Sequence, residues 1–195
     1  GYMLNDAARL SDNISRILNL AQIEGKSYKE NSVSIDLVAT TRLFLTNNRH
    51  LFQDSVITLK TPPEIRILYS IRISLYEILL MNLLTNAIKY NRSEQPKVDI
   101  SFTRKGSSLM IQFADNGIGI EKAYLKKIFK KFYQIGRSDN MSAKGTGIGL
   151  YMADTIARMH KGKIIADSPG KDEGSVFTLV LPYYQVIEEV AGQTV

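Results

Sequence analysis

The sequence of 195 residues contains no cysteine and only two histidines, His50 and His160. The absence of cysteine excludes disulfide bridges, thiolate metal sites and cysteine nucleophiles from this stretch of sequence. Two histidines are too few to build a histidine-rich metal centre. No apolar run approaches the roughly 20 residues of a membrane-spanning helix, and the longest run, residues 78–84, is interrupted by Asn82. No signal peptide is recognisable, so we expect these residues to act in an aqueous compartment.

The composition is that of an ordinary globular protein, with 44% hydrophobic and 23% charged residues. A net charge of +6 raises the hypothesis of nucleic-acid binding, because clustered basic residues track phosphates. The basic residues are scattered, however, and the densest run, residues 126–131, is typical of a solvated helix face. A basic surface beside a pocket would also attract a polyanionic small ligand. We therefore expect no nucleic-acid partner.

Apolar or small side chains recur every three or four residues from Leu4 to Ala21, which predicts an amphipathic helix that ends near Gly25. A helix this short is marginal by itself, so we expect it to pack against a partner helix in a dimer. The alternative is an ordinary helix that folds onto the domain that follows it.

Beyond residue 32 the sequence predicts strands and helices without regular alternation between them, which favours one mixed sheet with helices on one face. Asp36 can cap a helix, and Pro62–Pro63 between two short apolar runs indicates a hairpin or a tight loop. We expect helices near residues 36–52, 71–90, 121–129 and 148–160, and strands near residues 33–35, 56–59, 65–68, 97–103, 108–114, 163–167 and 175–181.

Asn82, Asn86 and Lys89 form a polar stripe on the otherwise apolar helix predicted near residues 71–90. Residues three or four apart share a helical face. Buried amides without partners are costly, and a hydrated Mg²⁺ ion with phosphate oxygens would satisfy this stripe. The alternative is a stripe that bonds to protein groups or to surface water.

A second segment, residues 115–120, has the sequence Asp-Asn-Gly-Ile-Gly-Ile and comes directly after a predicted strand. Its glycines let the backbone approach a ligand closely, and a carboxylate at a strand end can accept a hydrogen bond from an exocyclic amine. The same Asp-Asn-Gly sequence is also common in ordinary turns.

A third segment contains the aromatic residues Phe129, Phe132 and Tyr133, followed by polar residues 134–144 without a core-forming pattern. A mobile segment next to ligand-binding loops is typical of a lid. An inert surface loop is the alternative.

The fourth segment, residues 145–150, opens a predicted helix with three glycines, whose exposed N–H groups suit a phosphate. It is not the dinucleotide fingerprint, because Leu150 stands where the last glycine is required and no strand precedes it. Residues 25–27 are superficially similar to a P-loop, but Leu20 occupies the position of its first glycine.

Together, in sequence order, these segments resemble the N, G1, F and G2 boxes of the histidine kinase ATP-binding domain, within the superfamily of gyrase and the heat-shock chaperone. The resemblance covers about residues 33–182, and residues 9–24 resemble the second helix of the family's dimerisation and phosphotransfer domain. It implies an α/β fold, the two-layer α/β sandwich of the Bergerat type, preceded by one dimerisation helix. The implied division is residues 1–30 for dimerisation, residues 31–185 for ATP binding and residues 186–195 as a tail.

The resemblance also implies a role for each matching residue. Asn86 would coordinate Mg²⁺, Asn82 would line the phosphate region and Lys89 would contact phosphate. Asp115 would accept a hydrogen bond from the adenine amino group, and Tyr90 would lie against the adenine or ribose. The other residues assigned to the ATP site are Gly117, Gly119, Ile120, Phe132, Tyr133, Lys144, Gly145, Thr146, Gly147, Ile148, Gly149, Leu150 and Ser175, which replaces the family's usual threonine.

Asn82 distinguishes between activities within this superfamily. The hydrolases place a glutamate one turn before the Mg²⁺-binding asparagine as a base for water, whereas an amide takes no proton at neutral pH. Glu77 lies more than two turns before Asn86, on another face of the helix. The sequence therefore favours phosphoryl transfer to a protein acceptor, with a hydrolytic ATPase or a catalytically silent nucleotide-binding module as alternatives.

The phosphoacceptor histidine of the family is missing, because neither His50 nor His160 stands in the family's motif. We interpret both as surface or packing histidines and name no catalytic base. The resemblance implies ATP or ADP, the dimerisation helix of the same kinase and a response regulator receiver domain as partners, in a homodimeric full-length protein. It also implies a cytoplasmic location, with the full-length protein anchored in the inner membrane. This part alone should bind ATP without phosphorylating itself.

Overall fold

The computed structural model describes residues 32–135, 146–183 and 188–189. The N-terminal helix and both domain boundaries expected from the sequence lie outside these residues. The helices are α2 (Leu37–Asn47), the 3₁₀-helix η2 (Arg49–Leu51), α3 (Ile73–Lys89) and α4 (Gly149–Met159). The strands are β1 (Val33–Asp36), β2 (Val56–Leu59), β3 (Ile65–Arg66), β4 (Leu68–Ile71), β5 (Lys97–Lys105), β6 (Ser108–Asp115), β7 (Lys163–Asp167), β8 (Ser175–Pro182) and β9 (Glu188–Glu189).

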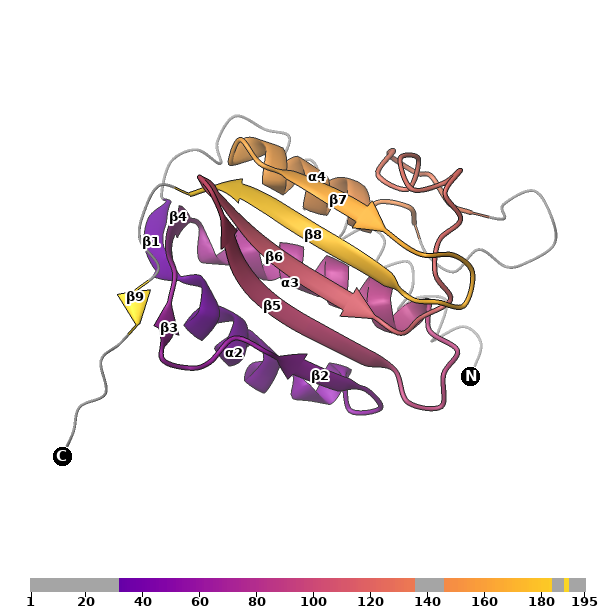
Figure 1. Ribbon diagram of the computed structural model, residues 1–195, viewed down its shortest axis with the longest axis horizontal. Coiled ribbons are helices and arrows are strands. Elements are labelled where there is room, and N and C mark those ends of the chain that lie inside the picture. Colours follow the sequence, from indigo (N-terminus) through magenta and orange to yellow (C-terminus); the bar gives the residue numbers. More distant parts are fainter. Residues whose placement is uncertain (1–31, 136–145, 184–187, 190–195) are drawn as a thin grey trace, which may run out of the picture.

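A mixed five-stranded sheet in the order β2-β5-β6-β8-β7 forms one layer of the molecule (Figure 1). The strands β5, β6, β8 and β7 pair antiparallel, whereas β2 runs parallel to β5 at one edge. Of the two alternatives predicted around Pro62–Pro63, the tight loop is confirmed and the hairpin is excluded, because β2 pairs with β5 and β3 pairs with β9. The prolines lie in the short connection between β2 and β3, where the N–H of Ile65 donates to the carbonyl of Pro62 (3.2 Å).

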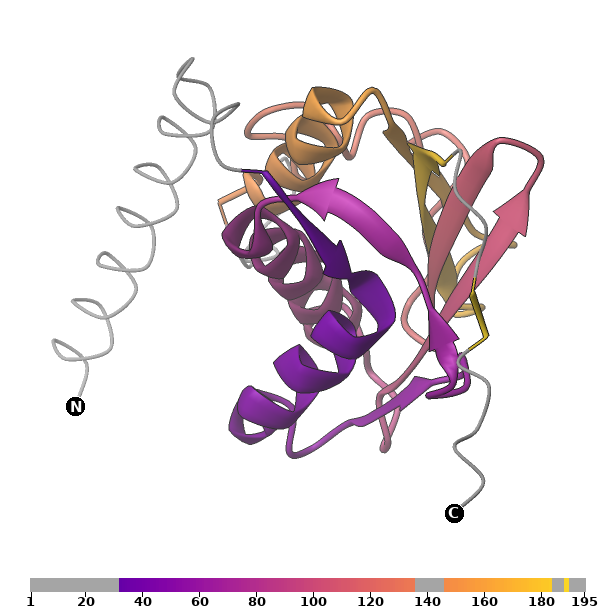
Figure 2. The same ribbon diagram turned by 90° about the vertical axis from the view of Figure 1, so that its left-hand side faces the viewer.

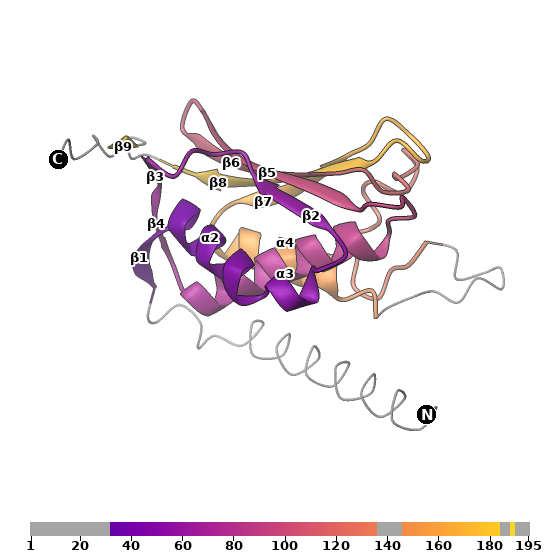
Figure 3. The ribbon, with the colours of Figure 1, turned by 90° about the horizontal axis from the view of Figure 1, so that it is seen from below.

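Helices α2, α3 and α4 all cover the same face of this sheet, so the molecule has two layers (Figures 2 and 3). Side chains alternate along β5, where Val98, Ile100 and Phe102 are buried against the helices. From the helical layer, α3 adds Tyr76 and Leu83 to this core. The predicted mixed sheet with helices on one face is therefore confirmed. Within the described ranges, no helix has the length and apolar character needed to cross a membrane.

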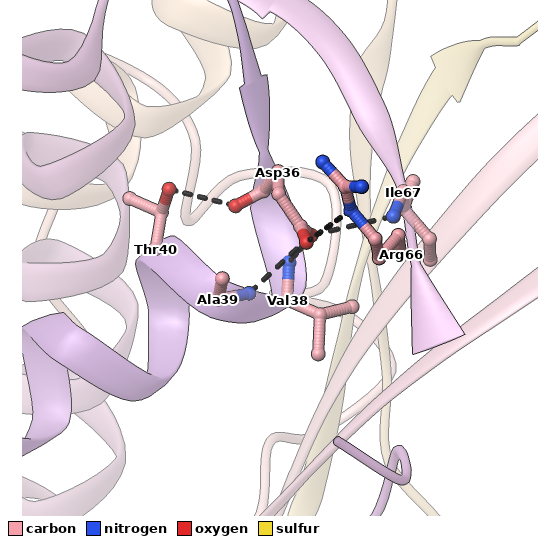
Figure 4. A network of polar contacts seen from close by, with 6 residues as sticks. All are labelled: Asp36, Val38, Ala39, Thr40, Arg66 and Ile67. Atoms are coloured by element: carbon pink, nitrogen blue, oxygen red, sulfur yellow. Dashed lines mark hydrogen bonds and ion pairs between the residues drawn. The ribbon is translucent and has the colours of Figure 1, made fainter. Parts of the chain in front are cut away.

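Asp36 joins β1 to the start of α2 and to the segment after β3 (Figure 4). Its Oδ1 accepts hydrogen bonds from the backbone N–H groups of Val38 (3.1 Å), Ala39 (3.4 Å) and Ile67 (3.3 Å). Its Oδ2 lies 3.6 Å from Nε of Arg66. The predicted helix cap is confirmed, and the same carboxylate also holds α2 to a second part of the chain.

Two predicted helices differ from those observed. The first ends at Asn47 rather than near Phe52, because the side chain of Asn48 donates to the carbonyl of Phe44 (2.9 Å) and caps it. Residues 121–129 form successive turns instead of a helix, with N–H groups bonded to carbonyls three or four residues earlier. Ile128 in this segment is buried, and its packing decides the local conformation over helical propensity.

Candidate functional site

A cavity of about 230 Å³ lies where α3, the end of β6, the turns after Ile128 and the start of α4 meet. Segments that are far apart in the sequence therefore come together at one end of the two layers. The residues that line the cavity are Asn82, Thr85, Asn86, Ala87, Lys89, Tyr90, Asp115, Ile118, Gly119, Ile120, Ile128, Tyr133, Gln134, Ile135, Thr146, Gly147, Gly149, Leu150, Ser175 and Phe177.

Asn82 is buried on α3, and its side-chain amide is oriented by protein groups. Its Nδ2 donates to the carbonyl of Ile78 (2.8 Å) and lies 3.7 Å from Sδ of Met152 on α4. Its Oδ1 would lie only 2.8 Å from a Cβ atom added at Gly149, so it faces the start of α4. The protein therefore fixes the amide group of Asn82. This agrees with the alternative in which the polar stripe bonds to protein groups.

Asn86 lies one turn further along α3 and lines the cavity with a half-buried side chain. Within the described part of the chain, its side chain forms no hydrogen bond. An amide oxygen suits a hard cation such as Mg²⁺. The described residues contain no group of three or more His, Cys, Asp or Glu side chains able to hold a metal, so a cation here would share Asn86 with ligand oxygens and water.

Lys89 and Tyr90 line the cavity at the C-terminal end of α3. Nζ of Lys89 lies 5.2 Å from the centroid of the Tyr90 ring, within the range of a cation–π interaction. A lysine at this position can neutralise an anion, and the half-exposed tyrosine ring offers a flat surface to a planar group.

Asp115 ends β6 at the cavity wall. Its Oδ1 accepts hydrogen bonds from the backbone N–H groups of Gly117 (2.8 Å) and Ser175 (3.2 Å). In the described part of the chain, its Oδ2 has no hydrogen-bond partner and is available to a donor on a ligand. Burial raises the pKa of this carboxyl above its ordinary value, although the two backbone bonds act in the opposite direction.

The segment 115–120, which we call the Asp115 loop, contains the turn expected as one alternative and also lines the cavity. The bond from Gly117 to the Asp115 carboxylate closes an ordinary Asx turn. Gly119 lines the cavity with φ +67°, and a Cβ atom there would overlap the carbonyl oxygen of Gly170. A side chain at Gly119 is therefore excluded twice, by backbone conformation and by space.

The start of α4 forms the opposite wall. Gly147 has φ +70°, and its carbonyl accepts a hydrogen bond from the N–H of Phe132 (3.0 Å). This bond joins the aromatic segment to the glycine segment. The N-cap residue of α4 is Ile148, and no side chain of the described residues caps this helix. The first N–H groups of the helix and its positive dipole end are therefore suited to an anion.

The cavity brings together most, but not all, of the residues predicted for a site. Gly117 packs against the carbonyl of Tyr90, Ile148 is buried in the core, and Phe132 is exposed. None of these three lines the cavity. Lys144 and Gly145 lie outside the described residues. The members that do line it are Asn82, Asn86, Lys89, Tyr90, Asp115, Gly119, Ile120, Tyr133, Thr146, Gly147, Gly149, Leu150 and Ser175.

Several residues that line the cavity were not predicted from the sequence. Phe177 shares a strand face with Ser175, and two-residue alternation along β8 could have found it. Thr85 is next to Asn86 in the sequence, but no motif marked it as a site residue. In the structure its hydroxyl donates to the carbonyl of Met81. The others are Ala87, Ile118, Ile128, Gln134 and Ile135.

A two-layer sandwich with this cavity at one end defines an α/β nucleotide-binding domain. Residues 72–185 match the family model described as "Histidine kinase-, DNA gyrase B-, and HSP90-like ATPase". This match spans more than half of the chain, and the chain belongs to that family. The resemblance of the sequence to the ATP-binding domain of this family is thereby confirmed.

Curated relatives carry consistent names. The chain is 28% identical over 185 residues to the sensor-like histidine kinase SenX3 of Mycolicibacterium smegmatis, covering 93% of this chain and 47% of that protein. It is 27% identical over 186 residues to the sensor histidine kinase WalK of Bacillus subtilis, covering 95% of this chain and 30% of that protein. The chain thus spans less than half of the length of these relatives.

Solved structures share the fold. The Acinetobacter baumannii histidine kinase AdeS superposes with a TM-score of 0.71 at 22% identity, covering 94% of this chain and 83% of that one. Full-length ShkA in complex with AMPPNP gives a TM-score of 0.73 at 17% identity, covering 92% of this chain and 37% of that one. The predicted fold class is therefore confirmed.

Proposed function

We propose that this chain is the catalytic domain of a protein histidine kinase, which transfers the γ-phosphoryl group of ATP to a histidine on a dimerisation helix. The observation that carries the proposal is the meeting of Asn86, Asp115 and the start of α4 at one cavity. An amide oxygen, a carboxylate and helix N–H groups suit three different parts of a magnesium nucleotide. Membership of the ATPase family and the names of the relatives support it.

Each part of the nucleotide has a matching group in the cavity. Oδ2 of Asp115 would accept from the adenine amino group, while Oδ1 keeps its two backbone partners. Lys89 and the uncapped N-terminus of α4 would hold the phosphates, and Asn86 would hold Mg²⁺. When bound, the ion neutralises charge on the phosphate oxygens.

The acid–base groups of the cavity favour transfer over hydrolysis. Asp115 is the one carboxylate among the described residues that line the cavity; its Oδ1 accepts from two backbone N–H groups, and its Oδ2 is assigned to the adenine amino group. Asn82 is neutral and held by Ile78 and Met152, so it cannot take a proton from water. A base supplied with the acceptor histidine, outside this chain, would complete the reaction.

The wider setting follows from the same proposal. Residues 1–30 would belong to the dimerisation and phosphotransfer domain, residues 31–185 to the ATP-binding domain and residues 186–195 to a tail. The full-length protein would form a homodimer, pass the phosphoryl group to an aspartate of a response regulator receiver domain, and act from the cytoplasmic side of the inner membrane.

The test of nucleotide and metal binding is calorimetry with ATP in the presence and absence of Mg²⁺. We expect ATP to bind, with an affinity that Mg²⁺ increases. Asn86→Ala should lose the increase, because alanine removes the amide oxygen but suits the helix. Asn47→Ala, at an exposed end of α2, is the matched control and should retain it. No ATP binding by the parent chain would overturn the proposal.

The test of phosphoryl transfer is to extend the chain upstream with the family's histidine-bearing helix. The extended protein should acquire acid-labile, base-stable phosphate from ATP, and the present chain should not. Sustained ATP turnover by the present chain would instead indicate a hydrolase. Nucleotide binding without transfer in the extended protein would indicate a nucleotide-sensing module.

A further inference from the structure

The loop between β7 and β8, residues 168–174, packs directly against the Asp115 loop. The N–H of Asp172 donates to the carbonyl of Ile118 (2.7 Å). On its other side, the N–H of Ile118 donates to the carbonyl of Tyr90 at the end of α3 (3.0 Å). The Asp115 loop is therefore held between α3 and residues 168–174.

Ser168 supplies a side-chain link between these two loops and is only 2% exposed. Its Oγ accepts a hydrogen bond from the N–H of Ile120 (3.0 Å) and lies 2.7 Å from the carbonyl oxygen of Gly174. The carbonyl oxygen of Gly170 is further away, at 3.2 Å. Since a hydroxyl has one proton, the shorter contact to Gly174 is the donated bond. Both the donor and the acceptor of this buried hydroxyl are used within the protein.

The position of Ser168 gives it influence over the cavity that it does not touch. Ile120 and Gly119 line the cavity, and Ser168 does not. Gly119 sits against the carbonyl of Gly170 with no room for a side chain. The links from Asp172 and Gly174 to the Asp115 loop are backbone to backbone, so a substitution does not remove them. Ser168 differs because its hydrogen bond to the Asp115 loop comes from a side chain. A substitution at Ser168 therefore changes how firmly the loop is held.

We propose that Ser168 is a positioning residue for the base of the nucleotide. Through Ile120 it fixes the Asp115 loop, and with it the wall that distinguishes adenine from other bases. This inference rests on the proposed function, because it takes the cavity to hold an adenine nucleotide. It adds a determinant of base selectivity that lies outside the cavity itself.

The experiment compares Ser168→Ala with the parent chain by two measurements. The first is hydrogen exchange of the Ile120 amide without nucleotide, where we expect protection to fall about tenfold because the acceptor is lost. The second is the affinity for ADP and for GDP by calorimetry. We expect ADP binding to weaken about tenfold and GDP binding much less, so that the ratio of the two affinities shrinks.

Thr61→Ala is the matched control. Thr61 is also a buried hydroxyl that accepts a backbone hydrogen bond, from Phe102 (3.0 Å), and it does not line the cavity. Its loss should leave the ratio of ADP to GDP affinity unchanged. If Ser168→Ala does not fold, Ser168→Cys carries the same measurements, since a thiol fills the space but is a weak acceptor.

Two results would overturn the inference. One is a Ser168 variant in which the hydrogen-exchange rate of the Ile120 amide and the ratio of ADP to GDP affinity both equal those of the parent chain. The other is an equal change of the ratio in Thr61→Ala, which would indicate general loosening. A parent chain that binds neither ADP nor GDP would count against the proposed function, and the exchange at Ile120 would still decide whether Ser168 holds the loop.

Discussion

At the scale of single residues, Asp115 divides its two carboxylate oxygens between folding and binding. Oδ1 ties the Asx turn of its own loop to the first residue of β8, through Gly117 and Ser175. Oδ2 is left as an acceptor for a ligand, in a residue that lines the cavity. Substitution by alanine removes both roles at once, and Asp115→Asn separates them, because an amide keeps an oxygen for the turn but presents N–H₂ to the ligand.

We expect Asp115→Asn to fold like the parent chain and to bind ATP at least tenfold more weakly, about the effect of a lost hydrogen bond to a charged group. Calorimetry gives the affinity and circular dichroism checks the fold. Asp99→Ala, an exposed carboxylate on β5, is the control and should bind as the parent does. Undiminished ATP affinity in Asp115→Asn would refute the assignment of this residue to the adenine.

The environment of His160 leads to a prediction about how stability depends on pH. It caps the C-terminus of α4, and its ring lies edge-on to Tyr69 with the centroids 6.1 Å apart. Its buried Nε2 has no hydrogen-bond partner in the described part of the chain. Burial lowers the pKa of this imidazole below its ordinary value of 6.5, so the folded state favours the neutral ring.

The folded protein should therefore lose stability as the pH falls through 6.5, because the unfolded chain takes up a proton that the folded chain resists. Above that pH the contribution is fully present. Between the two pKa values the free energy of unfolding should fall as the pH falls, because the unfolded chain binds this proton and the folded chain does not. Urea unfolding across this range should give a shallower pH dependence for His160→Gln, and equal slopes would contradict this account.

At the scale of elements, the start of α2 was predictable from adjacent residues, whereas the pairing of the strands was not. The Asp36 cap at the start of α2 is a property of adjacent residues and was predictable from the sequence. The same carboxylate also accepts from Ile67, a bond across the fold with no sequence signature. Residues 121–129 were predicted as a helix from local propensity, but the burial of Ile128 gives successive turns.

Asp36→Ala should lower the free energy of unfolding by about 2 kcal/mol, since it removes a helix cap and a tie to the segment after β3. The change is measured by urea denaturation, as a shift of midpoint at constant slope. Thr46→Ala, which removes an exposed side-chain bond within α2, is the control and should cost much less. ATP affinity should be unchanged in both variants, because neither residue lines the cavity.

At the scale of the whole molecule, the cavity draws on both layers. Asn82, Asn86 and Lys89 come from the helical layer, and Asp115 and Ser175 from the ends of adjacent strands of the sheet. A ligand that contacts both layers binds only the folded chain. Binding and folding are therefore linked by mass action.

ATP with Mg²⁺ at about 100 times its dissociation constant should raise the free energy of unfolding by about 2.7 kcal/mol. Thermal or urea unfolding with and without the nucleotide measures the difference, and Asp115→Asn should show less of it at the same ATP concentration. Stabilisation of equal size by GTP would point to general phosphate binding without recognition of adenine.

The sequence by itself determined which side chains could carry chemistry and roughly where the elements lie. Its information is local: Asn82 and Asn86 share a helical face because they are four residues apart, and β5 alternates because successive side chains point to opposite faces. Only the tertiary structure decided that β2 pairs with β5, that Met152 helps to orient the Asn82 amide, and that residues 168–174 hold the Asp115 loop. These contacts join residues that are distant along the chain, and no spacing rule encodes them, because they form only when the two layers pack.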